Sequence, residues 1–159
     1  MDGKKKLESR DMKILEFKNR SETLITQLLE IWEDSVTATH TFLSKSEINT
    51  IKKYVLSTLK RVSSLIVAES DDNFPIAFMK IEETKVEMLY VKNIERGKGV
   101  GSLLLNYGIN NYHVSEVTVN EQNPLAKAFY EHMEFKSYKG TELDEQGNAY
   151  PLIYMRLEK

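Results

Sequence analysis

Three glycines and two basic residues stand together in the segment Arg96–Gly101, which reads Arg-Gly-Lys-Gly-Val-Gly. An apolar run, Leu89–Val91, precedes it, and apolar residues at helical spacing follow it. Glycine lets the backbone come close to a ligand and adopt positive φ. The first N–H groups of a helix have no partner within the helix and attract anions. With the positive charges of Arg96 and Lys98, the segment predicts a cradle for a diphosphate.

The glycine spacing separates this segment from two common phosphate-binding loops. A Walker A loop needs GxxxxGK[ST] and the dinucleotide-binding loop needs GxGxxG, whereas the glycines here follow GxGxG. The segment does carry Arg-x-x-Gly-x-Gly on Arg96, Gly99 and Gly101. A binder of nucleotide phosphates that uses the same loop stays open as an alternative.

A second motif, Asn123–Phe135, lies further along the chain and reads N-P-L-A-K-A-F-Y-E-H-M-E-F. Together the two motifs resemble the coenzyme A loop and the N-x-x-A-x-x-F-Y-x-x-x-G-F segment of the GNAT superfamily of N-acetyltransferases. Three shorter segments are similar to a bacterial, YjaB-like branch of this superfamily; they are Ala38–Leu43, Asn120–Asn123 and Tyr150–Leu152. One position departs from the pattern, because Glu134 stands where the family usually has a glycine that ends the helix in a left-handed conformation.

The resemblance implies acetyl transfer from acetyl-CoA directly to an amine through a ternary complex, with no metal. The cofactor-binding residues that it implies are the backbone of Leu89, Tyr90 and Val91, the loop residues Arg96, Gly97, Lys98, Gly99, Val100 and Gly101, and the side chains of Asn123 and Tyr130. A splay between the strand over 85–92 and the next strand would leave its backbone groups free for the ligand. Asn123 has a second interpretation, because Asn followed by Pro is also a good helix start.

Acetyl transfer to an alkyl amine needs proton handling, because such an amine has a pKa of about 10 and is mostly protonated at neutral pH. The resemblance implies that Tyr130 is the acid that serves the leaving thiolate; the alternative is a tyrosine that packs the helix on the sheet. Glu87, which interrupts an apolar run, is our candidate base, directly or through water, or else a surface carboxylate. His40 and Glu33 are competing bases, and Ser35–Leu43 is expected to line the acceptor pocket.

The hydrophobic spacing predicts the order β-α-α-β-β-β-α-β-α-β-β from about Asp11 to the end of the chain. Strands are expected over 11–17, 64–69, 75–81, 85–92, 116–120, 135–138 and 150–157, with helices starting near 21, 46, 100 and 123 and a loop over 35–44. This order predicts an α/β (α+β) fold with a mixed sheet and helices on its faces. The resemblance implies the GNAT fold with about seven strands.

The helix after the glycines and the helix after Asn123 each have an expected buried face. The expected inward residues are Val100, Leu103, Leu104 and Tyr107 in the first, and Leu125, Ala128, Phe129 and Met133 in the second.

Length and composition set the remaining expectations. The 159 residues suit a flexible tail over 1–10 and a single domain over 11–159. The net charge of −2 gives no field that would draw the whole protein to nucleic acid or membrane. Cysteine is absent, which excludes disulfides and thiol nucleophiles, and the three histidines are scattered, so no metal is expected.

The location and the partners are expectations of the same kind. With no signal peptide and no apolar run long enough for a membrane span, a cytoplasmic monomer or homodimer is expected. Its acceptor would be an amine-bearing small molecule or protein. A non-catalytic acyl-CoA sensor or partner-docking module is the alternative function.

Overall fold

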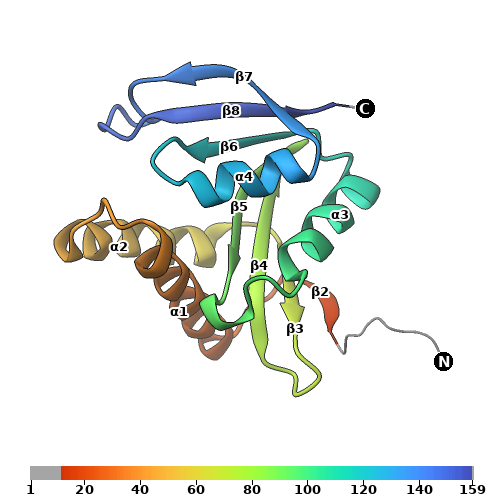
Figure 1. The fold of residues 1–159 in the computed structure, drawn as a ribbon. Helices are drawn as coiled ribbons and strands as arrows, with labels where there is room; N and C mark the ends of the chain where they lie inside the picture. The colour runs from red at the N-terminus through yellow and green to blue at the C-terminus, as the bar shows by residue number, and fades with distance from the viewer. Residues whose placement is uncertain (1–11, 159) are drawn as a thin grey trace.

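The computed structural model describes residues 12–158 and contains one mixed sheet between two layers of helices (Figure 1). The strands are β2 (Lys13–Phe17), β3 (Leu65–Glu69), β4 (Pro75–Glu82), β5 (Lys85–Val91), β6 (Glu116–Asn120), β7 (Phe135–Thr141) and β8 (Leu152–Leu157). The helices are α1 (Glu22–Thr39), α2 (Lys45–Arg61), α3 (Val100–Tyr112) and α4 (Pro124–His132), with a short 3-10 helix η2 (Asn93–Glu95). The predicted element order and the seven strands are confirmed. The predicted tail over 1–10 and the predicted strand start at Asp11 lie outside the described residues.

The sheet has the order β2-β3-β4-β5-β6-β8-β7, and the strand pairing differs between β5 and β6 from that in the rest of the sheet. All neighbouring strands are antiparallel except β5 and β6, which are parallel and pair only at Lys85 with Glu116 and at Val86 with Val117. Beyond Val86 the two strands separate, and β6, β8 and β7 run steeply across the direction of β4 and β5 (Figure 1). The implied splay is therefore present.

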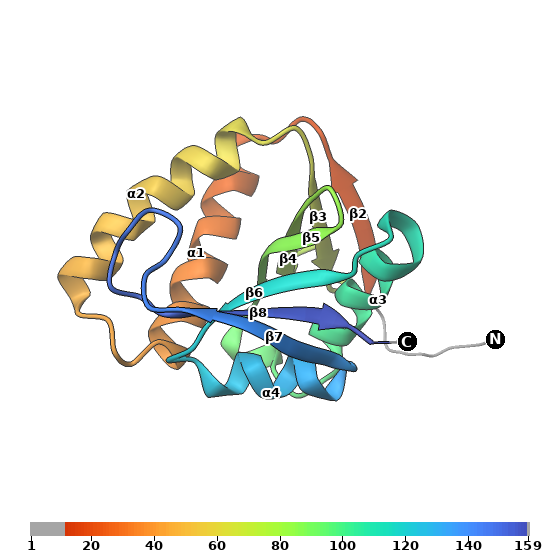
Figure 2. The ribbon, with the colours of Figure 1, turned by 90° about the horizontal axis from the view of Figure 1, so that it is seen from above.

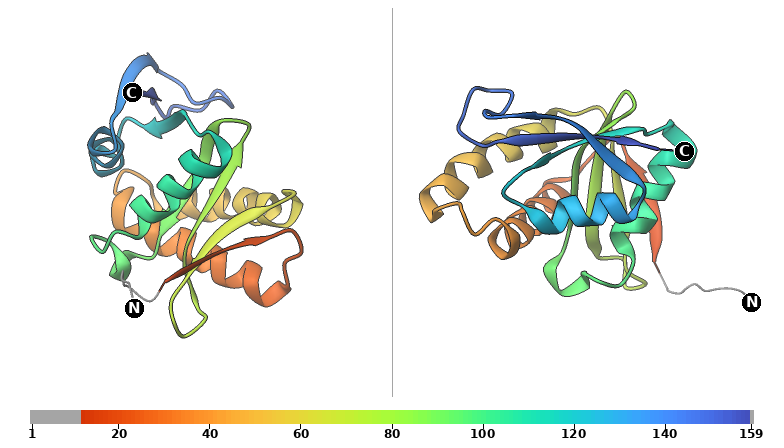
Figure 3. Two further views of the ribbon diagram at one scale, coloured as in Figure 1. Left: turned by 90° about the vertical axis from the view of Figure 1, so that its right-hand side faces the viewer. Right: turned by 45° about the horizontal axis from the view of Figure 1, so that its top comes forward.

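Each face of the sheet is covered by one pair of helices (Figure 3). The core under α1 and α2 includes Leu28, Trp32, Val36, Leu59 and Phe78, and the core under α3 and α4 includes Met79, Leu104, Leu105, Phe135 and Met155. Because both cores include side chains of β5, the strand beside the splay is packed from both faces of the sheet.

The predicted loop over 35–44 is wrong in its first half, because α1 continues to Thr39. Val36 is only 2% exposed, and its burial outweighs the low helix propensity of the neighbouring Ser and Thr residues. The hydroxyl of Thr39 also finds an acceptor inside the helix, the carbonyl oxygen of Ser35 at 2.8 Å. The loop itself is short, because Ser44 already starts α2 in a capping box with Glu47.

The predicted inward faces of α3 and α4 are partly wrong. In α3, Val100 and Leu104 are buried as expected, but Leu103 is 37% exposed and Leu105 is buried in its place. In α4, Phe129 and Met133 pack against the core, whereas Leu125 and Ala128 are exposed. The inward side of α4 also carries Ala126 and Tyr130, and the N-cap Asn123 is buried at its start. Apolar spacing alone does not single out an asparagine, an alanine and a tyrosine as inward residues.

Two further boundaries differ from the sequence prediction. Strand β7 continues to Thr141, three residues past the predicted end at 138, and β8 begins at Leu152 and not at 150. At the end of α4, Glu134 has a φ of 73°. The helix thus ends in the left-handed conformation in spite of the side chain, and Glu134 carries the steric cost that a glycine would avoid.

Candidate active site

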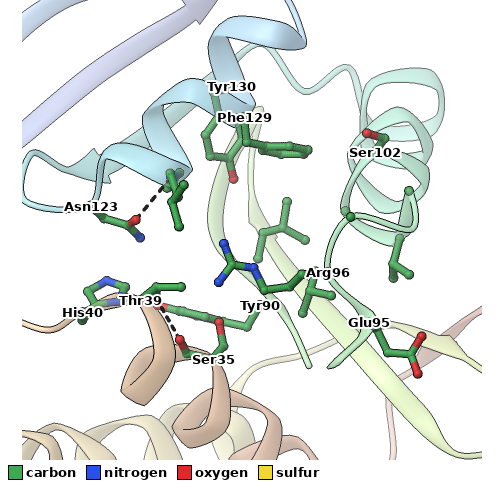
Figure 4. Close-up of a pocket in the computed structure, with 18 residues that line it drawn as sticks. Ser35, Thr39, His40, Tyr90, Glu95, Arg96, Ser102, Asn123, Phe129 and Tyr130 are labelled. Carbon is green, nitrogen blue, oxygen red and sulfur yellow. Dashed lines mark hydrogen bonds between the residues drawn. The ribbon is translucent and has the colours of Figure 1, made fainter. Parts of the chain in front are cut away.

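Two cavities meet where β5 and β6 separate. The first, here named the loop cleft, has a volume of about 410 Å³ and lies between residues 95–102, β5 and α4 (Figure 4). The second, here named the sheet pocket, has a volume of about 320 Å³ and lies between the end of α1, β5, β6 and the loop before β8. Six residues line both: His40, Leu89, Tyr90, Asn123, Ala126 and Tyr130. The volumes suit small ligands or segments of larger ones.

The glycines of the loop cleft have the backbone geometry that the sequence predicts. Gly97 has a φ of 79° and Gly99 a φ of 86°, both in the region that favours glycine. Gly99 is the N-cap of α3 and, having no side chain, makes no capping hydrogen bond. The first N–H groups of α3 are therefore left for a ligand, and the helix dipole favours an anion there.

Of the two predicted basic residues, Arg96 lines the loop cleft and Lys98 does not. The Arg96 guanidinium extends into the middle of the cleft, below Tyr130 (Figure 4). Lys98 is 58% exposed and pairs with Glu95 at 3.6 Å, and Glu95 itself lies on the cleft wall. The positive charge in the cleft comes from Arg96, which makes no ion pair within residues 12–158.

Strand β5 lines the gap with Leu89, Tyr90 and Val91. These residues pair with β4 on one side, but β6 has already turned away on the other. Their backbone groups on the β6 side thus have no ladder partner and can serve a ligand. Leu89 and Val91 pack toward the α3 and α4 core, whereas Tyr90 packs toward α1 and α2. Burial raises the pKa of Tyr90, and a hydrogen bond with Trp32 opposes the rise.

Helix α4 contributes Asn123 and Tyr130. The Asn123 side-chain oxygen accepts from the Ala126 amide at 3.2 Å as the N-cap, and the other end of its amide faces the cleft (Figure 4). Tyr130 is 5% exposed, its ring meets those of Phe129 and Phe135 edge-on, and its hydroxyl points into the cleft (Figure 4). Burial, with a smaller contribution from Tyr90, raises the pKa of Tyr130, so its hydroxyl keeps its proton.

Glu87 lies in the sheet pocket and not in the loop cleft. A β-bulge at this point puts Val86 in the core under α3 and Met88 against the opposite core, so Glu87 and Met88 both reach the sheet pocket. The carboxylate is 35% exposed and has Lys80 at 3.8 Å and Lys85 at 4.0 Å.

The competing bases differ in their positions. His40 lines both cavities, whereas Glu33 pairs with Lys52 at 2.6 Å and lines neither. The segment 35–43 does line the cavities: Ser35 and Thr39 face the loop cleft, and Val36, Phe42 and Leu43 face the sheet pocket.

Several lining residues were not predicted from the sequence. The hydroxyl of Thr118 on β6 is buried at the sheet pocket without a partner among the described residues. Asp144 and Tyr150 close the pocket from the loop before β8, which reaches across to α2 (Figure 2). There the Tyr150 hydroxyl donates to Glu47 at 2.6 Å. No short motif marks Thr118 or Asp144, and the segment Tyr150–Leu152 gave no sign that Tyr150 lines a pocket, because the fold brings these residues together from distant parts of the chain.

A family model described as "Acetyltransferase (GNAT) domain" matches residues 28–159. The chain belongs to the GNAT acetyltransferases. Two relatives are both named peptidyl-lysine N-acetyltransferase YjaB, one from Salmonella typhimurium strain LT2 and one from Escherichia coli strain K12. Each is 34% identical over 127 residues, which cover 80% of this chain and 87% or 86% of the relative.

Solved structures agree with this assignment. The solution structure of apo-form YjaB from Escherichia coli superposes with a TM-score of 0.83 at 30% identity, over 91% of this chain and 96% of that one. A PaiA N-acetyltransferase from Thermoplasma acidophilum in complex with coenzyme A shares the fold, with a TM-score of 0.65 at 22% identity, over 92% and 99% of the two chains. By its family the chain is an N-acetyltransferase, and GNAT acetyltransferases use acetyl-CoA.

Within residues 12–158, no group of three or more His, Cys, Asp or Glu side chains could hold a metal ion. None of the helices in that range is long and apolar enough to cross a membrane.

Proposed function

We propose that this enzyme transfers the acetyl group of acetyl-CoA to the side-chain amine of a lysine in a peptide or protein. The observation that carries the proposal is the meeting of two cavities at the gap between β5 and β6. A coenzyme in the loop cleft and an amine in the sheet pocket would come together beside Tyr90 and Tyr130. Direct transfer in a ternary complex needs such an arrangement of two bound reactants.

The sheet pocket suits a lysine side chain. Its walls include Trp32, Phe42 and Met88, which can contact the four methylene groups of the lysine stem. Glu87 and Asp144 supply negative charge for the ammonium. The names of the two YjaB relatives, peptidyl-lysine N-acetyltransferase, support the same acceptor class.

In this proposal the loop cleft holds the coenzyme. The amides of 97–101 at the start of α3 and the Arg96 guanidinium bind the diphosphate. Free backbone groups of Leu89 and Val91, with the Asn123 amide, bind the pantetheine arm. The bound coenzyme supplies the thioester, whose carbonyl carbon the amine attacks.

Tyr130 is proposed as the acid that serves the leaving sulfur. Its raised pKa keeps it neutral, so it can always donate a hydrogen bond. A thiolate is a weaker base than a buried phenolate, so complete transfer of the proton from Tyr130 alone is uphill. The hydroxyl therefore acts by stabilising the negative charge that develops on sulfur, and the proton follows once the phenolate can be reprotonated.

The test is release of free thiol from acetyl-CoA in the presence of lysine peptides, with the acetylated product located by mass spectrometry. Peptides with Arg in place of Lys are the matched control, and a polyamine is the competing small-molecule acceptor. The proposal expects thiol release and lysine acetylation with the Lys peptides only. Coenzyme binding without thiol release, or turnover with the polyamine alone, would contradict it.

A further inference from the structure

His40 occupies the junction of the two cavities, where an amine and a thioester would meet. It follows α1 as the helix C-cap, and its backbone N–H donates to the Val36 carbonyl at 2.8 Å. The centroid of its ring lies 5.3 Å from that of the Phe42 ring. Figure 4 shows His40 on the side of the cleft opposite α4. Asn123 and the Tyr130 hydroxyl face the same space from above (Figure 4).

The neighbouring Thr39 determines which ring nitrogen of His40 carries the proton. The Thr39 hydroxyl lies 2.8 Å from the Ser35 carbonyl oxygen, which can only accept, so the single hydroxyl hydrogen is used there. The same hydroxyl oxygen lies 2.9 Å from Nδ1 of His40. Because the oxygen has no second hydrogen to give, Nδ1 must be the donor. The neutral imidazole is therefore protonated on Nδ1 and has its lone pair on Nε2.

Nε2 has no hydrogen-bond partner among residues 12–158. Burial lowers the pKa of His40, so the ring is neutral at pH 7. The ring also follows the C-terminal end of α1, where the helix dipole favours a cation once the ring takes up a proton. These features describe a side chain that is neutral at rest and stabilised when it becomes charged.

We infer that His40 is the general base of the transfer, with Nε2 as the proton acceptor and Thr39 as the positioning residue. This inference rests on the proposed function. An N–H bond of the bound ammonium breaks and an N–H bond forms on Nε2, directly or through one water. The freed lone pair attacks the thioester carbonyl, and the C–S bond breaks. One proton then leaves His40 to solvent, and the second amine proton reaches the sulfur by way of the Tyr130 hydroxyl.

Glu87 differs from His40 in both position and surroundings. It lines only the sheet pocket, and two lysine ammonium groups lie within 4.0 Å of it. It does not line the loop cleft, where the thioester would lie. Glu87 thus binds the positively charged acceptor, while His40 removes its proton.

The pH dependence must take account of every charged or titratable group around His40. Those that line the same cavities are Glu87 and Tyr90 of β5, Glu95 and Arg96 beside the coenzyme loop, Tyr130 of α4, and Asp144 and Tyr150 before β8. None of these is a histidine. We therefore expect the rate to fall at low pH as His40 takes up a proton, with a midpoint below 6.5, the pKa of histidine in model peptides.

Kinetics of matched variants test the assignment. His40→Gln should lower kcat by about 10²-fold and abolish the acid limb of the profile. The control His132→Gln, at the exposed end of α4, should leave both unchanged. Glu87→Gln should raise the KM for the acceptor more than it lowers kcat. Thr39→Val should lower kcat, and Thr39→Ser, which keeps the hydroxyl, should restore it.

A second measurement does not depend on turnover. Nitrogen-15 NMR of the imidazole side chains should show Nδ1 protonated and Nε2 unprotonated for the signal that disappears in His40→Gln. The opposite tautomer would overturn the inference, as would a His40→Gln enzyme with wild-type kcat and an intact acid limb. If the wild-type enzyme acetylates no lysine peptide, the proposed function fails, and the tautomer still decides the proton position at His40.

Discussion

Replacing Tyr130 with Phe removes one oxygen from the point where the two cavities meet. No hydrogen bond within the described residues involves this hydroxyl, so its loss leaves no buried partner unsatisfied. The ring contacts persist, with centroid distances of 5.0 Å to Phe129 and 5.7 Å to Phe135. The free energy of unfolding and the affinity for coenzyme A should therefore change little.

The catalytic effect of Tyr130→Phe should be large by comparison. Loss of a general acid typically costs about 10²-fold or more in rate, which corresponds to about 2.7 kcal/mol of transition-state stabilisation. The assay is thiol release under saturating acetyl-CoA and lysine peptide, with thermal unfolding and calorimetric coenzyme binding measured in parallel. Tyr138→Phe is the matched control, because Tyr138 lies on β7, is 43% exposed and lines neither cavity.

Two results would show that Tyr130 is not the acid. A kcat within a factor of about three of wild type would mean that the hydroxyl does not serve the leaving group. A loss of stability or coenzyme affinity as large as the loss of rate would mean that the tyrosine acts by packing.

Three other positions give separate tests, by calorimetry for the first and by denaturant unfolding for the others. Arg96→Ala should weaken coenzyme A binding about tenfold, as the loss of one charged contact does, while Lys98→Ala, already paired and exposed, should weaken it less. Glu134→Gly should stabilise the fold by about 1 kcal/mol by removing a Cβ at φ 73°, whereas Glu134→Ala, which keeps that atom, should not. Gly108→Ala should not give the stabilisation of about 1 kcal/mol that Gly→Ala brings inside a helix, because its Cβ would come within 3.1–3.2 Å of three buried or partly buried side chains that must move to make room. Gly140→Ala, whose Cβ would stay 3.7 Å from the nearest atom, is its control.

The features of the site that depend on local conformation were predictable from the sequence. Gly97 and Gly99 need positive φ, and only glycine adopts it without strain, so their spacing marks the loop. Asn123 followed by proline marks the start of α4 in the same way. Glu134 is different, because the family pattern marks this position as a left-handed helix end but does not tell whether a glutamate keeps that conformation; its φ of 73° comes from the structure alone.

The features that depend on distant contacts were not predictable. The bulge that turns Glu87 into the sheet pocket follows from its register against β4, and the alternation of residues along β5 does not show it. The pocket wall at Tyr150 depends on a hydrogen bond to Glu47, 103 positions away. The continuation of α1 to Thr39, on which the inferred His40 tautomer rests, depends on the burial of Val36 in the core that α1 and α2 share and overrides local propensity.

We propose that the amides at the start of α3 hold the coenzyme diphosphate, and backbone amide NMR during a coenzyme A titration can show whether they do. Saturable shifts should concentrate at residues 96–102 and 89–91, with a smaller set at Asn123 and Tyr130. Desulfo-coenzyme A, which keeps the diphosphate but lacks the thiol, should shift the amides of 96–102 equally. An unperturbed 96–102 segment in the presence of saturating coenzyme A would contradict the account.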